Sequence, residues 1–501
     1  MKIMRLLIRK LSGPVVLGGM VLATCTVSAQ SAGNVIYAAP DGKTAAAGTI
    51  DDPYTIFRAV EKVAPGGTIY VRGGVYKFTD RRLNLDKEGT ADRPYRMFAY
   101  RDEQPVFDCS VLDLGNVKSN NAIRVRTGSY WHVKGIDVTN CAMAGIRVEN
   151  GNHNTFEDCV SYNNGKNGFE LYNSSYTTFR NCVSHHNGGS GFSMGYGHEG
   201  VDKPDPNPDG KKLAYNTFIN CDAYNNFDWF TEGKPGTNSD GFAARGKIGP
   251  GNKYVGCRAW SNSDDAWDFY ECGRAVQLID CWAWRTGVWS DHAEMYREKT
   301  GEELTEELFA GNGNGFKLGG ACLYNEERDW CNGYSKGAHL LRNCIAFSNR
   351  IRGIDQNNHA FGCVVENCLT FGNGQNIGLW RANRDETPWM FRNNISFDGK
   401  RKDSYNQSRG VKVLFETNNW DLKLTDPKVC AGQFVSLSEE DARAPRGKDG
   451  SLPGRFGRLK AGSIFIDKGT ITGPVKGDGF ECPAIPYEGS APDLGAFECR
   501  P

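Results

Sequence analysis

The sequence has no excess of either charge and no apolar run long enough to cross a membrane as a helix. Its 501 residues include 59 Lys and Arg and 59 Asp and Glu, so the formal charge is zero. Proteins that bind nucleic acid through its phosphates carry a basic surface, so we expect no nucleic-acid partner. The apolar run 15–22 is too short to span a bilayer, and no second run of sufficient length follows. We therefore expect no membrane-spanning helix.

Residues 1–29 have the pattern of a secretory signal peptide. A basic start is followed by the apolar run and by the small residues Val27-Ser28-Ala29, which are typical of a cleavage site. Removing this segment takes away four basic and no acidic residues, which leaves residues 30–501 with a formal charge of −4. Lipid attachment at Cys25 is an alternative that the preceding Thr24 disfavours. We predict a secreted or periplasmic monomer.

A repeat of about 24 residues runs through the middle of the chain. Successive units are 23 or 24 residues apart, except where insertions lengthen three of them. Short β-type runs at such a period, separated by turn residues, indicate a solenoid in which stacked coils share one core. The units are aligned on Cys159, Cys182, Cys221, Cys257, Cys281, Cys344 and Cys368, with Gly135 in the same place upstream.

Two further columns share this alignment. Asparagine stands five residues after the cysteine in most units and, by the same count, at Asn140; stacked amides can bond from coil to coil. An aromatic residue or histidine stands three residues after it, from Tyr162 to Phe397, and we interpret this column as core packing. The column cysteines are expected to be buried thiols. The better disulfide candidates are Cys322 with Cys331 and Cys482 with Cys499.

The flanks of the repeat complete a single all-β catalytic domain over residues 30–501. Residues 30–130 are expected to form the N-terminal cap and first coils, with a short capping helix at 55–63 and a strand at 67–72. Residues 131–400 are the repeat coils, and residues 401–501 the last coils and loops. The stretch 426–473, rich in Gly, Pro and charge, is expected to run along the outside.

A second sequence pattern, which we call the landmark, allows positions on different coils to be compared. A small residue followed by a large apolar one occurs in each unit, as at Gly241-Phe, Ala266-Trp, Gly315-Phe, Gly353-Ile and Gly378-Leu. Directly before it stand Asp240 and Asp265; two residues after it stand Asp268, Lys317, Asp355 and Trp380. Neighbouring strands are about 4.8 Å apart. Four carboxylates, with Asp264 included, and one lysine therefore converge on one patch.

This patch has the composition of a calcium site beside a base. Close carboxylates repel one another unless a cation lies among them, and oxygen ligands from flexible turns suit Ca²⁺. The simpler alternatives are an ordinary Asp264-Asp265 turn and a surface ion pair for Lys317. A lysine amine is a competent base if its pKa falls; a nearby dication lowers that pKa, whereas the carboxylates raise it.

At these residues the chain resembles the family 9 polysaccharide lyases. The matching pieces are Asn238–Phe242, Gly256–Asp268, Asn314–Gly320 and Gly353–Asn358. The resemblance implies a right-handed parallel β-helix with calcium held by Asp240, Asp264, Asp265 and Asp268 and with Lys317 as the base. It also implies β-elimination on an acidic plant polysaccharide, in which Lys317 removes H5, the C4–O4 bond breaks and a 4,5-unsaturated end remains.

Other side chains on the next coils are candidate substrate contacts, namely Arg350, Arg352, Asp355, Gln356 and Arg381. Insertions on both sides of the expected groove leave homogalacturonan and the rhamnogalacturonan I backbone as open alternatives. A glycoside hydrolase of polygalacturonase type would also show Asn-x-Asp and Asp-Asp, but its Gly-His-Gly and Arg-x-Lys motifs are absent from the next coils. A non-catalytic carbohydrate-binding β-helix is the third reading.

Overall fold

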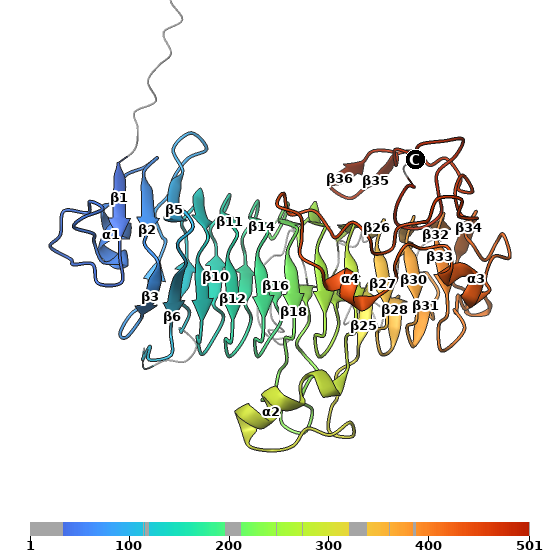
Figure 1. Ribbon diagram of the computed structural model, residues 1–501, viewed down its shortest axis with the longest axis horizontal. Coiled ribbons are helices and arrows are strands. Elements are labelled where there is room, and N and C mark those ends of the chain that lie inside the picture. Colours follow the sequence, from blue (N-terminus) through green and yellow to red (C-terminus); the bar gives the residue numbers. More distant parts are fainter. Residues whose placement is uncertain are drawn as a thin grey trace, which may run out of the picture. The chain divides into compact units, whose positions relative to one another are not determined.

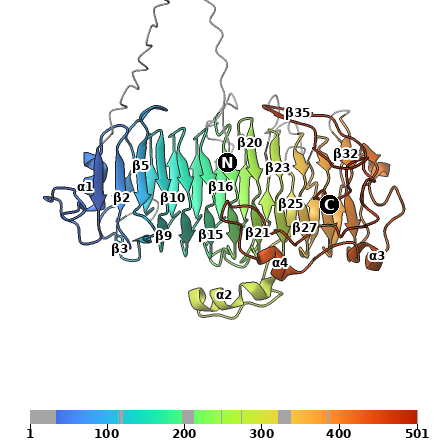
Figure 2. The same cartoon turned by 45° about the horizontal axis from the view of Figure 1, so that its top comes forward.

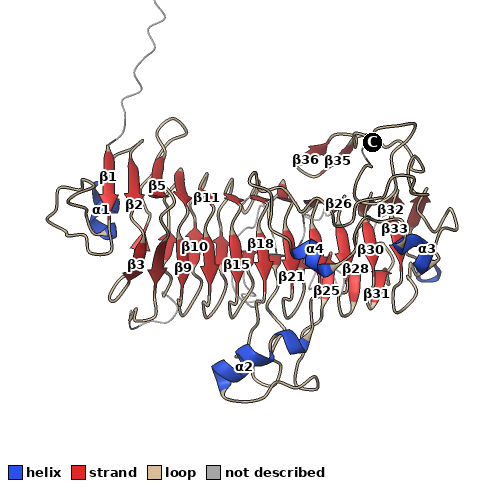
Figure 3. Ribbon diagram, in the orientation of Figure 1, coloured by secondary structure: helices blue, strands red, loops and turns tan. Residues whose placement is uncertain are grey.

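Three parallel sheets run side by side along the solenoid, and most coils contribute one strand to each sheet (Figures 1 and 3). The computed structural model describes residues 34–499 except 114, 116–119, 196–211, 247, 273, 320–337, 360 and 384–386. Gly33–Pro501 forms one compact unit. The prediction of a parallel β-helix is confirmed.

Sheet A has 13 strands in the described residues: β1 (Val35–Ala38), β2 (Thr68–Val71), β5 (Tyr95–Ala99), β8 (Trp131–Lys134), β11 (Thr155–Glu157), β14 (Thr178–Arg180), β17 (Thr217–Ile219), β20 (Asn252–Val255), β23 (Val276–Ile279), β26 (Leu340–Arg342), β29 (Val364–Glu366), β32 (Trp389–Arg392) and β34 (Val413–Glu416). Sheet B has 11: β3 (Gly74–Lys77), β6 (Pro105–Asp108), β9 (Asp137–Thr139), β12 (Val160–Tyr162), β15 (Val183–His185), β18 (Asp222–Tyr224), β21 (Arg258–Trp260), β24 (Trp282–Trp284), β27 (Ile345–Phe347), β30 (Leu369–Phe371) and β33 (Ile395–Phe397).

Sheet C has ten described strands: β4 (Leu83–Asn84), β7 (Ile123–Val125), β10 (Ile146–Glu149), β13 (Phe169–Tyr172), β16 (Phe192–Gly195), β19 (Phe242–Arg245), β22 (Trp267–Asp268), β25 (Asn314–Lys317), β28 (Arg352–Asp355) and β31 (Gln375–Gly378). A separate antiparallel pair joins β35 (Val475–Gly477) to β36 (Phe480–Cys482). The helices are α1 (Ile56–Lys62), α2 (Ala293–Thr300), α3 (Pro427–Ala431) and α4 (Glu439–Arg443), with 3-10 turns η2 (Trp289–Asp291) and η4 (Gln407–Arg409).

An asparagine ladder fixes one corner of the coils. Asn164 Nδ2 donates to Asn187 Oδ1 at 2.9 Å, Asn187 to Asn226 at 3.0 Å, and Asn226 to Asn262 at 2.8 Å. The small landmark residue lies against this ladder: a Cβ on Gly241 would come 2.9 Å from Asn262 Nδ2 and 2.7 Å from the Ala266 carbonyl. The ladder therefore explains why the landmark is small. The predicted place of Asn140 is wrong by one residue, since Cys141 N–H donates to Asn164 Oδ1.

The capping helix is confirmed at the N-terminal end of the solenoid (Figures 1 and 2). Thr55 caps α1 by accepting the Arg58 N–H at 3.2 Å, and Val63 ends it. Ile56, Ala59 and Val60 are buried and join the core that begins at β1 and β2. The helix thus covers apolar side chains that the first coil would otherwise expose.

The aromatic column lies on the outer face of sheet B, so its interpretation as interior core is wrong. Its rings stack from Tyr162 through His185, Tyr224 and Trp260 to Trp284 at centroid distances of 4.4 to 5.1 Å. The inward residues of these strands are small, as with the fully buried Ser161. Further along, the column becomes buried because the segment carrying α3 and α4 packs over it, as the sequence predicted for 426–473.

The seven column cysteines are buried and free, as predicted. Cys482 and Cys499 are also free, so the disulfide prediction for that pair is wrong. The Cys482 thiol instead accepts a hydrogen bond from Arg342 Nη1 at 2.9 Å. The Cys322–Cys331 pair, Cys25 and the signal segment 1–29 lie outside the described residues. Within the described ranges, no helix has the length and apolar character needed to cross a bilayer.

A buried ion-pair network fastens the C-terminal segment to the coils. Asp222 on β18 receives hydrogen bonds from Arg258 at 2.6 and 3.0 Å and from Arg446 at 2.5 and 3.1 Å. Arg258 also donates to the carbonyls of Ala442 and Ala444. Burial acts to raise the pKa of Asp222, but the two arginines outweigh burial and hold that pKa below the ordinary value of 3.8.

We expect Asp222→Ala to lower the free energy of unfolding by about 3–5 kcal/mol, because two buried arginines lose their counter-ion. Urea unfolding followed by tryptophan fluorescence measures this, since Trp260, Trp282 and Trp284 lie under the segment. The Asp222 contribution is present at neutral pH and is lost as the pH falls through its lowered pKa. The control Glu439→Ala breaks only more exposed ion pairs, those of Glu439 with Arg443 and Arg285, and a loss no larger than in that control would contradict the fastening role.

Candidate active site

The charged column of sheet C faces outward on neighbouring coils. Phe242, Trp267, Phe316 and Ile354 pair in register and are buried in the core, so the residue after each points away from the core. Those outward positions are Ala243, Asp268, Lys317 and Asp355, which confirms the predicted alignment. The alignment is wrong one coil later, where Gly378 rather than Trp380 pairs with Asp355.

Three aspartates gather at the corner before these strands. Asp240 precedes β19, and Asp264 and Asp265 precede β22 on the next coil; Gly241 N–H donates to the Asp265 carbonyl. One carboxylate oxygen of each of the three lies within 4.8 Å of the others, and all three residues are buried. Asp268 is also buried, and it is linked to this group through two cations.

The four carboxylates share one mode of anchoring. In each, Oδ1 accepts a backbone N–H, which orients the group and leaves Oδ2 to face its neighbours. The donors are Asp265 to Asp240 (3.2 Å), Asn312 to Asp264 (2.7 Å), Asn314 to Asp265 (2.9 Å) and Tyr270 to Asp268 (3.0 Å). We call Asp240, Asp264, Asp265 and Asp268 the acid cup.

Two cations contact the cup from either side. Lys317 Nζ lies 2.9 Å from Asp265 Oδ2 and 3.3 Å from Asp268 Oδ1. Arg245 Nη2 contacts Asp240 Oδ2 and lies 2.8 Å from Asp268 Oδ2. Arg245 was missed in the sequence, although a signal for it existed. It stands two residues after Ala243 on the same strand, so it shares the outward face, one coil from Asp268.

The acid cup has fewer positive charges than its buried carboxylates need to stay ionised, as their pKa shifts indicate. Burial raises the pKa of Asp240 to about 7 despite Arg245, and burial and then Asp265 raise the pKa of Asp264 well above its usual range. For Asp268 burial is outweighed by Lys317 and Arg245, which lower its pKa. The pKa of Lys317 is raised well above its ordinary value, because the carboxylates, Asp265 first, outweigh its burial.

The donor set fits a divalent cation. Four ionised carboxylates against two cations leave a charge of −2 in a buried space, which one dication would balance. All the candidate ligand atoms are hard carboxylate oxygens, three of the residues at the corner and Asp268 on β22, and such a set suits Ca²⁺ better than metals that prefer sulfur or imidazole. The residues present therefore fit the ion that the sequence predicted.

The insertion before Lys317 helps to build the cup. Phe227, Tyr296, Leu304 and Phe309 form a small apolar cluster that holds the segment carrying α2, which projects from the coils in Figures 1 and 2. This segment ends at Asn312, whose N–H orients Asp264. The insertion is therefore a structural part of the cup and lies beside the outward face of sheet C.

The candidate substrate contacts have different surroundings. The Arg352 guanidinium lies 4.0 Å from the Trp380 ring centroid and 3.5 Å from Asp355 Oδ1, and Trp380 Nε1 donates to the same oxygen at 3.2 Å. Arg350 is exposed, and its Nη1 donates to the Gly311 carbonyl at 2.8 Å. Asp355 is therefore buried one coil beyond Lys317, while Arg352 covers the indole next to it.

The side chain of Gln356 is enclosed in the protein and bonded to backbone groups. It is fully buried; its Nε2 donates to the carbonyls of His359 and Arg381, and its Oε1 accepts the N–H of Arg381. Since these bonds hold the backbone of the next coil, the predicted uronate contact of Gln356 has no support in the structure. Arg381 itself is half-buried beside it.

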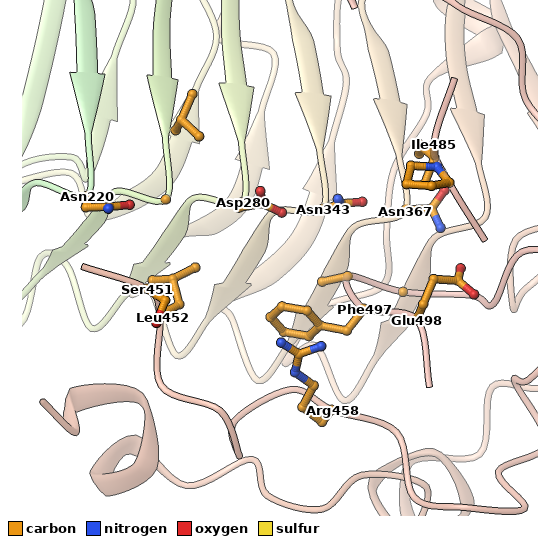
Figure 4. Close-up of a pocket in the computed structure, with 15 residues that line it drawn as sticks. Asn220, Asp280, Asn343, Asn367, Ser451, Leu452, Arg458, Ile485, Phe497 and Glu498 are labelled. Atoms are coloured by element: carbon orange, nitrogen blue, oxygen red, sulfur yellow. The ribbon is translucent and has the colours of Figure 1, made fainter. Parts of the chain in front are cut away.

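A cavity of about 400 Å³ lies elsewhere, at the corner between sheets A and B (Figure 4). The corner residues Asn220, Asp280 and Asn343 lie in a row along it, and Arg458 and Phe497 of the C-terminal segment face them. The acid cup is on the outward face of sheet C. This cavity is thus a gap under the C-terminal segment and has no part in the cup.

Comparison with known proteins places the chain in a family. Residues 36–200 and 172–394 match the family model described as "Pel9A-like, right handed beta helix region". The chain belongs to the Pel9A-like family of right-handed β-helix proteins. The prediction of a family 9 relative is thereby confirmed, together with the handedness of the solenoid.

Relatives of this family cover nearly the whole chain. Pectate lyase L of Dickeya dadantii (strain 3937) is 33% identical over 480 residues, which is 94% of this chain and 92% of that protein. Pectate lyase L of Paenibacillus polymyxa (strain SC2) is 29% identical, covering 90% and 87%. The crystal structure of pectate lyase Pel9A is similar with a TM-score of 0.64 and 30% identity, covering 93% of this chain and 96% of that one.

A solved rhamnogalacturonan lyase is also similar, with a TM-score of 0.58, 25% identity and coverage of 86% of this chain and 97% of that one. These relatives and solved structures, each at least 25% identical to the chain, are named as lyases. The predicted enzyme class, polysaccharide lyase, is confirmed for this member of the Pel9A-like family.

Proposed function

We propose that the protein cleaves galacturonate-containing pectin by calcium-dependent β-elimination. The observation that carries this proposal is the Lys317 amine, which lies 2.9 Å from Asp265 and 3.3 Å from Asp268 at the rim of the acid cup. A base next to a cation site is the arrangement that removal of a proton beside a carboxylate requires. The names of the relatives support pectin as the substrate class.

Asp240, Asp264, Asp265 and Asp268 would hold the ion. When bound, calcium supplies positive charge that binds the C6 carboxylate of the substrate and acidifies H5. In the structure the carboxylates raise the pKa of Lys317 and hold its amine protonated. Positive charge bound among these carboxylates would offset that effect and make the neutral amine accessible.

Lys317 then acts on the sugar. Its Nζ takes H5, the C5–H electron pair forms the C4–C5 double bond, and the C4–O4 bond breaks. The leaving oxygen takes a proton from water. The products are a new reducing-end fragment and a fragment with a 4,5-unsaturated uronate. The buried cup excludes water from its carboxylates, which strengthens their interaction with charge.

Two parts of the surroundings are suited to a chain of sugars. The Arg352 guanidinium over Trp380, beside buried Asp355, offers a cation one coil from Lys317 for a neighbouring uronate. Export of the chain, for which the 1–29 pattern argues, would bring a monomeric enzyme to a polymer outside the cytoplasm.

Product analysis on homogalacturonan and rhamnogalacturonan I, digested side by side with calcium present, tests the proposed function. We expect ultraviolet absorbance from unsaturated uronates to rise with at least one of them, in step with new reducing ends. Reducing ends without absorbance would show hydrolysis of the polygalacturonase type. Binding without new ends would show a non-catalytic carbohydrate-binding β-helix. Either result would contradict elimination.

A further inference from the structure

The contacts of Arg245 do not fit a purely structural arginine. Its Nη2 contacts Asp240 Oδ2 and Asp268 Oδ2, the oxygens that the anchoring pattern turns toward the cup. The same Asp240 oxygen also accepts the Ser190 hydroxyl at 3.2 Å. The buried Nε of Arg245, however, donates to no group of the described residues. A guanidinium with an unused buried donor is not in its best-satisfied position.

Arg245 and a cation in the cup would use the same oxygens. The guanidinium already pairs with Oδ2 of two of the four carboxylates, so a dication that binds these Oδ2 atoms has to displace it. Arg245 has room to move, since its side chain is 33% exposed, compared with 10% for Lys317. It stands on β19, one coil before Asp268, so its freed donors would lie on the outward face of sheet C beside the cup.

Resting on the proposed function, we propose that Arg245 is a positioning residue that exchanges partners when calcium binds. Without the ion it is the counter-charge of Asp240 and Asp268 and thereby weakens calcium binding. With the ion in place its guanidinium turns away from the cup along the outward face of sheet C and pairs with a galacturonate carboxylate of the substrate, for which its planar fork is suited. The exchange couples calcium binding to the capture of an acidic saccharide.

The experiment uses the full chain and measures two affinities. Titration calorimetry gives the calcium Kd of the wild type and of Arg245→Ala. Trigalacturonate binding is then measured on the calcium-loaded proteins, each carrying Lys317→Ala so that no turnover occurs. We expect Arg245→Ala to bind calcium about tenfold more tightly, because a competing charge is gone, and trigalacturonate about tenfold more weakly. The opposite signs separate this role from a structural one, which would weaken both.

Two further variants complete the design. Arg147→Ala is the matched control, because Arg147 lies on β10 of the same sheet and pairs with Glu170 at 3.1 Å, away from the cup; both affinities should stay at wild-type values. Arg245→Lys keeps the charge without the fork, so calcium affinity should stay close to wild type while trigalacturonate binding weakens. It also serves if Arg245→Ala fails to fold, which thermal melting in EDTA reveals.

The outcomes distinguish a failure of the Arg245 exchange from a failure of the proposed function. Calcium affinity that is unchanged or weaker in Arg245→Ala overturns the exchange. Tighter calcium binding with unchanged trigalacturonate binding supports the competition and overturns the pairing with substrate. If the wild type binds no calcium, the proposed function fails before the role of Arg245 is reached.

Discussion

Lys317→Ala is expected to lower the elimination rate by roughly 10²- to 10⁴-fold, the range typical of a general base. The reason is geometric, since Lys317 is the amine that contacts the acid cup, and the outward face of sheet C offers no second lysine at this position in the described residues. The loss should appear in kcat, because the acid cup and the proposed saccharide contacts around Arg352 remain in place. Initial rates of unsaturated-uronate formation measure it.

The variant should fold and bind calcium. Removing Lys317 takes one cation from Asp265 and Asp268, so calcium affinity should be retained or increased. Lys253→Ala, an exposed lysine on β20 of sheet A, is the matched control and should keep full activity. A Lys317→Ala protein that turns over pectin at a wild-type rate would remove Lys317 as the base.

Removal of calcium is expected to abolish activity, and its return to restore it. Without the ion the four carboxylates keep Lys317 protonated, and among the described residues only Arg245 and Lys317 form ion pairs with the cup. The ion should also stabilise the fold, by about 2.7 kcal/mol at a concentration 100 times its Kd. Activity and melting temperature in EDTA, and after adding Ca²⁺ or Mg²⁺, measure both effects. Magnesium should restore less, because it requires stricter octahedral geometry.

The pKa of Asp240 in the acid cup predicts how calcium affinity depends on pH. The pKa of Asp240 is raised to about 7 by burial, with Arg245 opposing, so protons compete with the ion for this carboxylate in neutral solution. Calcium should bind more weakly as the pH falls below about 7 and should release protons when it binds. Calorimetry in buffers of different ionisation enthalpy counts those protons. Activity unaffected by EDTA, or calcium binding without proton release, would contradict this description.

The sequence was informative where the repeat was regular. Phe242, Trp267 and Phe316 directly follow a Gly or Ala on each coil, and this spacing placed Asp268 beside Lys317 and Asp240 beside Asp265. The residue there is small because it lies against the asparagine ladder, so the landmark has a physical cause. The landmark failed at Gly378 because the true equivalent pair on that coil, Asn376-Ile377, lacks the glycine.

The remaining errors have physical reasons. Stacked aromatic rings suit an interior and also an outer face that another segment covers, and only the packing of α3 and α4 decides between them for Trp260 and Trp284. Arg245 lies outside the aligned columns, and its role depends on a side-chain direction. The free Cys482 is far along the chain from its partner Arg342, so sequence spacing gave no indication of that contact.

The most direct test of a calcium-filled acid cup is an anomalous difference map from a crystal of Lys317→Ala grown with calcium and trigalacturonate. We expect one strong peak about 2.3–2.6 Å from carboxylate oxygens of Asp240, Asp264, Asp265 and Asp268. We also expect a sugar carboxylate to share the ion, and C5 to face the place vacated by the lysine amine. A peak at another location, or a cup that stays without an ion while saccharide is bound beside it, would contradict a calcium-filled acid cup.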